Sequence, residues 1–99
     1  MAVSTTFLAK VKLALRVSST SFDTQISDLI EEAILDLTTT ADIATFTTDN
    51  ADAVQTGAVI AYVSYKWFGM DDKYFRAYND QKMKMSTSST YRPEVVEDV

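Results

Sequence analysis

The sequence predicts an all-α fold, a small bundle of about four helices followed by an extended C-terminal tail. Its 99 residues include only two Gly and one Pro, which leaves few positions suited to tight turns. Apolar residues also recur at spacings of three and four in separate stretches, the period of an amphipathic helix. A chain of this length supports one domain with one modest core. We expect the helical domain over residues 1–90 and the tail over residues 91–99.

The first helix is expected over about residues 5–16, with Ser4 or Thr5 as its N-cap. The polar segment 17–21 then interrupts the apolar period, and its hydroxyl groups suit a turn. The apolar side of this helix is formed by Phe7, Leu8, Val11, Ala14 and Leu15.

The second helix has the clearest pattern, and Ser21 or Asp23 is the expected cap at its start. After it, β-branched residues weaken helix propensity over residues 38–49, so we expect a loop there with at most one turn of helix. Ile43 and Phe46 of that loop are expected in the core. The apolar stripe of the helix consists of Ile26, Leu29, Ile30, Ala33, Ile34 and Leu37.

Two further helices complete the expected bundle. The third runs from residue 50 or 51 to Phe68, with Asp49 or Asn50 as its cap, and Gly69 stands where a left-handed C-terminal residue is favoured. The fourth runs from about residue 71 to residue 85, before a Ser/Thr-rich break. On its apolar side we expect Tyr74, Phe75, Tyr78, Gln81 and Met85.

The third helix is apolar on two opposite sides, which indicates partners on both. One side carries Val54, Ala58, Ala61, Tyr62 and Tyr65. The other side is our candidate subunit interface, with the core of the same subunit as the open alternative, since the other helices of one bundle can surround it. It carries Val59, Ile60, Val63 and Trp67.

Charge is segregated along the chain, whose formal net charge is -5. Residues 1–17 carry three bases and no acid, whereas residues 18–58 carry eight acids and no base. Residues 59–92 are again net basic, and the tail is acidic. Such polarity suits head-to-tail association of copies and argues against binding of duplex DNA, which needs a dominant basic surface.

Four carboxylates lie on one side of the second helix, with no Lys or Arg four residues away to relieve them. Three interpretations are open: a solvated face, a face that meets a basic neighbour, or an acidic channel face. The residues are Asp28, Glu31, Glu32 and Asp36.

The composition disfavours an enzyme. The chain has neither Cys nor His, which removes thiolate sites, the Ser–His pair and the commonest zinc ligand. Asp71 and Asp72 suit a helix start better than a cation site, and Gly57 and Gly69 stand alone rather than in a phosphate loop. We therefore expect no catalytic, metal or cofactor-binding residue. No signal peptide or membrane span is evident, and we expect a soluble protein made in a cytoplasm.

Three ordered pieces of the chain resemble the small head–tail connector proteins of long-tailed bacteriophages, also called head-completion or adaptor proteins. The first is Val-Lys-Leu-Ala-Leu-Arg-Val at 11–17 with Phe-Asp-Thr-Gln-Ile at 22–26, and the second is the helix at 26–33. The third begins at 62–69. It continues through Asp72, Phe75, Tyr78, Met85, the Ser/Thr run and Tyr91-Arg92.

The resemblance implies a helical ring, typically dodecameric, beneath the portal protein of a filled capsid. Such a ring extends the DNA channel without sequence-specific binding and docks a downstream stopper or tail-completion protein. It implies no covalent chemistry and a location at the head–tail interface of the virion. The tail residues expected to engage the portal are Tyr91, Arg92 and Pro93. The alternative function is a small acidic helical module that binds another protein as a homodimer.

Overall fold

A computed structural model describes residues 3–41, 43–44, 46–88 and 91. Over these residues the chain forms four α-helices, one short 3-10 helix and no strand, so the all-α prediction is confirmed. Apart from Tyr91, the extended tail predicted over residues 91–99 lies outside the described residues. In chain order the elements are α1 (Thr5–Leu15), η1 (Thr20–Phe22), α2 (Asp23–Thr40), α3 (Ala53–Trp67) and α4 (Asp72–Thr87).

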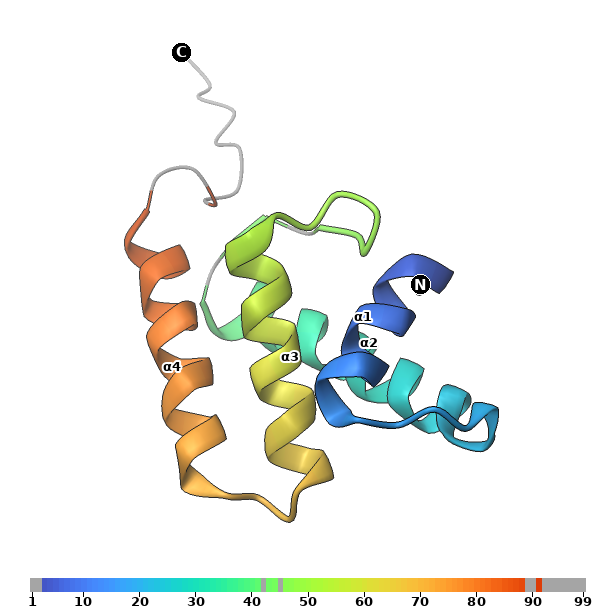
Figure 1. The fold of residues 1–99 in the computed structure, drawn as a ribbon. Coiled ribbons are helices and arrows are strands. Elements are labelled where there is room, and N and C mark those ends of the chain that lie inside the picture. The colour runs from blue at the N-terminus through green and yellow to red at the C-terminus, as the bar shows by residue number, and fades with distance from the viewer. Residues whose placement is uncertain (1–2, 42, 45, 89–90, 92–99) are drawn as a thin grey trace.

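The third helix is the centre of the bundle. α3 and α4 form an antiparallel hairpin, and α1 and α2 pack on the other side of α3 (Figure 1). Their apolar stripes meet in one core, which accounts for most of the favourable free energy of a domain this small. The largest fully buried side chains are Val11, Ile26, Ile30, Ile34, Leu37, Val59, Val63 and Met85.

The first helix begins at the predicted cap, because the Ser4 hydroxyl accepts a hydrogen bond of 3.1 Å from the Phe7 amide. It ends in a left-handed residue, Arg16, with a φ of 59°. The Arg16 amide donates to the Leu13 carbonyl and the Val17 amide to the Lys12 carbonyl, the paired bonds of a Schellman motif. The chain therefore reverses sharply before α2.

The second helix differs from the prediction at both ends. Ser19 caps the short η1, which runs directly into α2, and α2 has no side-chain cap of its own. The predicted caps Ser21 and Asp23 are therefore wrong. The helix also continues through Thr40, and within it the threonine hydroxyls at 38–40 donate to carbonyls one turn back, which satisfies their polar groups.

The segment between α2 and α3 packs on the core, and Ile43 and Phe46 are buried as predicted. A tight turn at 48–50 follows, so α3 begins later than expected. Its cap is Asp52 rather than Asp49 or Asn50. The Asp52 carboxylate accepts from the Gln55 amide while the Gln55 side chain accepts from the Asp52 amide, a complete capping box.

The turn between α3 and α4 confirms Gly69 as the left-handed residue, with a φ of 78°. Met70 is also left-handed, and its amide donates to the Tyr65 carbonyl over 2.7 Å. Two left-handed residues in succession therefore reverse the chain between the two helices.

The fourth helix is capped by Asp71, whose carboxylate accepts from the Lys73 amide. It extends two residues beyond the predicted end at Met85, because the Thr87 hydroxyl donates to a carbonyl one turn back. Tyr78 and Met85 form its buried side.

Candidate interaction surfaces

The predicted interface on α3 divides between core and surface. Val59 and Val63 are fully buried inside the subunit, so the prediction that they contact a neighbouring copy is wrong for this fold. The physical reason is that α4 covers one side of α3 while α1 and α2 cover the other (Figure 1). Ile60 and Trp67 are half-buried, and the Trp67 ring packs edge-on against Phe22 with centroids 5.4 Å apart.

The predicted acidic face also divides. Glu32 turns toward α3, where it accepts a hydrogen bond from the Tyr62 hydroxyl and lies 3.8 Å from the Lys66 ammonium. Asp36 accepts from the Tyr78 hydroxyl of α4, with the Lys82 ammonium at 3.5 Å. Glu32 and Asp36 are thus paired within the subunit and help to hold α2 against the hairpin.

Burial and these carboxylates raise the pKa of both phenols. For Tyr62 the main cause is burial, followed by the hydrogen bond to Glu32, and the pKa rises well above 10.0. For the pKa of Tyr78 burial again comes first, and the bond to Asp36 adds to it. The two rings also meet edge to face, with centroids 5.2 Å apart. A phenol that stays protonated continues to donate, so the contact persists through neutral pH.

The outward side of α2 keeps Asp28 exposed and Glu31 half-buried. Leu35 lies one turn beyond Glu31 and two turns beyond Asp28 on the same side, and its side chain is 63% exposed. Leu35 lies outside the apolar stripe predicted for α2, and a leucine placed among carboxylates is the sequence signal for this exposed position. This side of α2 is therefore an acidic surface with an exposed leucine.

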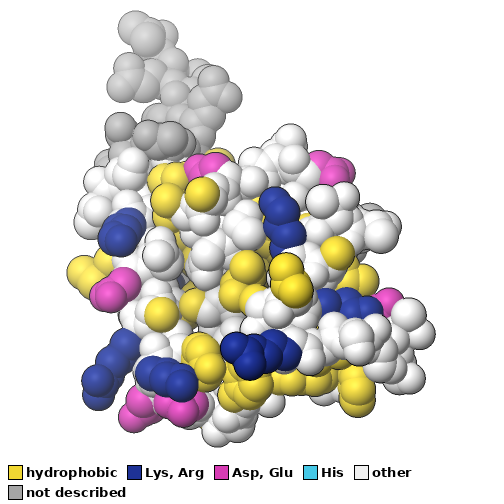
Figure 2. Space-filling model, in the orientation of Figure 1, with side chains coloured by type: hydrophobic (Ala, Val, Ile, Leu, Met, Phe, Trp, Pro, Cys, Tyr) yellow, Lys and Arg dark blue, Asp and Glu magenta, His cyan; other side chains and the backbone are white. Residues whose placement is uncertain are grey.

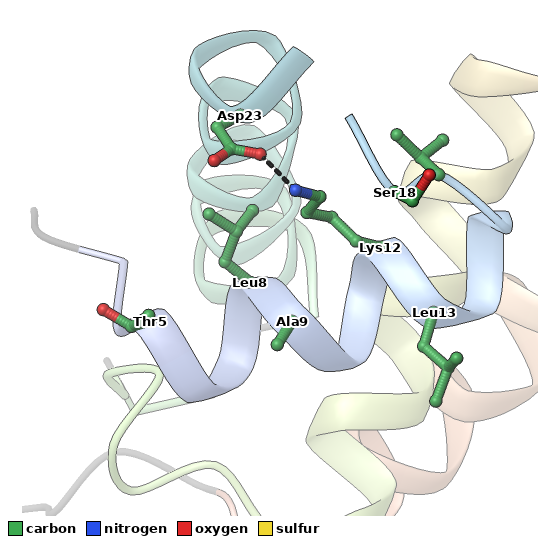
Figure 3. A pocket seen from close by; sticks show the side chains of 8 residues that line it. Thr5, Leu8, Ala9, Lys12, Leu13, Ser18 and Asp23 are labelled. Carbon is green, nitrogen blue, oxygen red and sulfur yellow. Dashed lines mark ion pairs between the residues drawn. The ribbon is translucent and has the colours of Figure 1, made fainter. Parts of the chain in front are cut away.

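The outward side of α1 has the opposite charge. Leu13 is 80% exposed, and Lys10 and Arg16 flank it at a spacing of three. Lys12 points to the other side of α1, where its ammonium lies 2.7 Å from the Asp23 carboxylate at the start of α2 (Figure 3). A shallow depression of about 310 Å³ lies beside α1, and its wall includes Leu13 together with the Lys12–Asp23 pair. This surface is basic with an exposed leucine at its centre.

Aromatic side chains gather at the turn between α3 and α4. Phe68 stacks on Tyr74 with centroids 5.4 Å apart, and Tyr65 packs on Phe75 at 5.1 Å. The Lys73 ammonium lies 4.9 Å from the centre of the Tyr74 ring. Figure 2 shows hydrophobic and basic side chains interleaved toward this end of the visible face. Because the rings pair with one another, the cluster stabilises the turn.

Tyr91, the predicted portal residue that the structure describes, packs on its own domain. Its hydroxyl donates to Asp52 over 2.6 Å, and its carbonyl accepts from the Ala44 amide over 2.7 Å. Arg92 and Pro93 lie outside the described residues. The structure thus places the root of the tail at the start of α3.

Over the described part of the chain, no group of three or more carboxylates could hold a metal ion. Within the same residues, no helix is long and apolar enough to cross a membrane. The chain matches no protein-family model, no curated protein and no solved structure.

Proposed function

We propose that this chain is a structural head–tail connector of a long-tailed bacteriophage. In this proposal its copies form a ring, typically dodecameric, beneath the portal protein, and the ring extends the DNA channel. A downstream stopper or tail-completion protein docks on the ring. Support comes from the three resembling pieces. The first runs from α1 to the start of α2, the second lies on α2, and the third begins on the α3–α4 hairpin.

The observation that carries the proposal is the exposure of large apolar side chains on opposite-charged surfaces of one small subunit. Leu13 lies on basic α1 and Leu35 on acidic α2. A ring requires two different complementary surfaces on each copy, whereas a dimer requires one self-complementary surface. The geometry therefore favours the ring over the homodimeric binding module.

The tail has a defined role in this proposal. Tyr91 fixes the point where the segment leaves the domain, through its contacts with Asp52 and Ala44. Arg92 and Pro93 follow at once in the sequence and contact the portal in this proposal. The net charge of -5 keeps DNA from adhering as it passes through the ring.

The first test is the mass of the purified chain in solution across concentration, alone and with the portal protein of the same phage. A ring, formed alone or on the portal, is the expected result. A stable dimer whose mass does not change when the portal protein is added contradicts the proposal and supports the homodimeric module.

The tail is tested by two truncations. A chain ending at Tyr91 is expected to lose portal docking while its helical circular dichroism stays unchanged, because the contacts of Tyr91 survive. A chain ending at residue 90 also loses the hydrogen bond from Tyr91 to Asp52. Comparison of the two chains separates the loss of portal docking from a loss of domain stability. Portal docking that is unchanged in both truncated chains rules out the tail as the portal-binding segment.

A further inference from the structure

Two leucines on neighbouring helices are exposed to solvent, and the core of the subunit does not account for a large apolar side chain at either position. Leu13 on α1 is 80% exposed and Leu35 on α2 is 63% exposed. Both helices bury a complete apolar stripe on their other side, so neither leucine is needed for the core. A single exposed leucine needs no partner, so the inference depends on the charges that surround the two leucines.

The charges around the two leucines are complementary. Lys10 on α1 and Arg16 at its C-cap lie beside Leu13, and α1 has no acid, whereas α2 carries five acids and no base. Within the same subunit Asp23 pairs with Lys12, Glu32 with Lys66 and Asp36 with Lys82. Asp28 is exposed on the outward side of α2, the side that also carries Leu35. The two outward surfaces therefore differ in the sign of their charge.

We propose that α1 of one copy packs against α2 of a second copy, with Leu13 on Leu35 and with Lys10 and Arg16 facing the Asp28 side. This contact would be the interface between neighbouring copies of the proposed ring. That the repeated contact closes into a circle rests on the proposed function. Figure 3 shows Leu13 pointing away from Lys12, which reaches α2 of its own subunit, and the two residues line one shallow depression. A copy therefore offers Leu13 to another molecule, and the contact repeats from copy to copy.

Like-with-like pairing of these surfaces is unfavourable. Two α1 surfaces brought together would place Lys10 and Arg16 against the same bases, and two α2 surfaces would place Asp28 against carboxylates. Repulsion of like charges disfavours both arrangements, so the contact joins two different surfaces. A contact of this kind adds further copies, into a ring or an open filament, rather than stopping at a dimer. The assignment also puts the outward side of α2 between copies rather than on the channel wall.

Cysteine cross-linking tests the contact directly, because the chain has no native cysteine. A chain with Leu13→Cys and Leu35→Cys, treated with a short bismaleimide, is expected to form covalent dimers, trimers and higher multiples. Each single variant is expected to run as a monomer after denaturation, since its one thiol faces an unreactive leucine of the neighbouring copy. A matched control pairs Leu13→Cys with Met83→Cys, at a methionine that lies 64% exposed on α4. Strong cross-linking in a single variant or in this control overturns the proposal.

Charged substitutions at the two leucines give a second test that needs no cross-linking reagent. Leu13→Glu and Leu35→Lys each replace an apolar side chain at the centre of the contact with a charge, and each is expected to weaken association about tenfold or more. Glu and Lys are good helix formers, so the monomer is expected to keep its circular dichroism. The chain carrying both substitutions is expected to recover association, because the new carboxylate on α1 then meets the new ammonium on α2. Single variants that associate as strongly as the original chain overturn the proposal.

The same variants separate this inference from the proposed function. A ring on the portal without cross-links between positions 13 and 35 overturns the contact and leaves the connector function standing. Cross-linked multimers formed by a chain that does not bind the portal protein overturn the connector function and support the contact between α1 and α2. If neither the cross-links nor a ring on the portal is observed, both the contact and the connector function are overturned.

Discussion

The hydroxyl of Tyr91 lies 2.6 Å from Oδ2 of Asp52, and this contact fastens the last described residue to the start of α3. The same carboxylate accepts from the Gln55 amide through Oδ1 over 2.8 Å. Burial acts to raise the pKa of Asp52, but the bonds from Gln55, Tyr91 and Val54 outweigh it and lower the pKa. One side chain therefore serves both as helix cap and as anchor for the root of the tail.

Removal of the Tyr91 hydroxyl tests the anchor. We expect Tyr91→Phe to lower the free energy of unfolding by about 1 kcal/mol, because it removes one hydrogen bond to a carboxylate at a partly exposed site. Asp52→Ala is expected to lower it by about 1–2 kcal/mol through loss of the cap as well. Urea unfolding at neutral pH measures both, and the double variant gives their coupling. Strictly additive effects contradict the anchor.

The lowered pKa of Asp52 gives an acid dependence. In the folded chain this pKa lies below the ordinary value of 3.8, so the ionised carboxylate stabilises the fold fully above that value. That stabilisation is lost as the pH falls through the folded pKa. We expect the difference in unfolding free energy between the original chain and Asp52→Asn to be constant near neutral pH and to shrink below about pH 4. A difference that grows on acidification refutes this assignment.

The raised pKa values of Tyr62 and Tyr78 give an alkaline dependence. Each phenol stabilises the fold fully below the ordinary pKa of 10.0, and this stabilisation is lost as the pH rises through the higher folded pKa. Ultraviolet titration of the five tyrosines is expected to show a late fraction that ionises only as the chain unfolds. Tyr78→Phe is expected to lower the free energy of unfolding by about 1–3 kcal/mol and to reduce that late fraction. Tyr74→Phe, which alters a ring stacked on Phe68 beside the Lys73 ammonium, is the matched control for the loss of a tyrosine hydroxyl.

Local patterns were sufficient for much of the fold. The stripe from Ile26 to Leu37 predicted the buried side of α2, and Ser4 and Gly69 predicted one cap and one turn, because each signal lies within a few residues. Contacts between distant residues were not predictable in this way. The bond from Tyr78 to Asp36 joins positions 42 apart in the chain, so the acidic side of α2 looked unrelieved in the sequence.

The candidate interface failed for a related reason. Periodicity showed that α3 has two apolar sides, but only the packing of four helices decides which sides stay inside one subunit. Val59 and Val63 proved to be core, whereas Leu13 and Leu35 proved to be exposed. Leu13 lies within a segment used for the resemblance, and neither leucine belongs to a stripe that the sequence analysis assigned to a contact. Exposure is a property of the assembled bundle rather than of a single helix.

The two consecutive left-handed residues between α3 and α4 allow opposite predictions from adjacent substitutions. Gly69 has a φ of 78°, and a Cβ there would meet nothing within 4 Å. The cost of Gly69→Ala is therefore conformational, and we expect it to lower the free energy of unfolding by about 1 kcal/mol. Met70 has a φ of 64° with an exposed side chain, so Met70→Gly relieves strain with little loss of packing.

For Met70→Gly we expect a gain in the free energy of unfolding of up to about 1 kcal/mol, reduced by the greater freedom of glycine in the unfolded chain. Met70→Ala is the control, because it removes the same side chain but keeps the strained backbone, and we expect it to give no gain. Thermal and urea unfolding of the three variants test this set. A gain in Met70→Ala equal to that in Met70→Gly would assign the effect to the exposed methionine side chain instead of to the left-handed backbone.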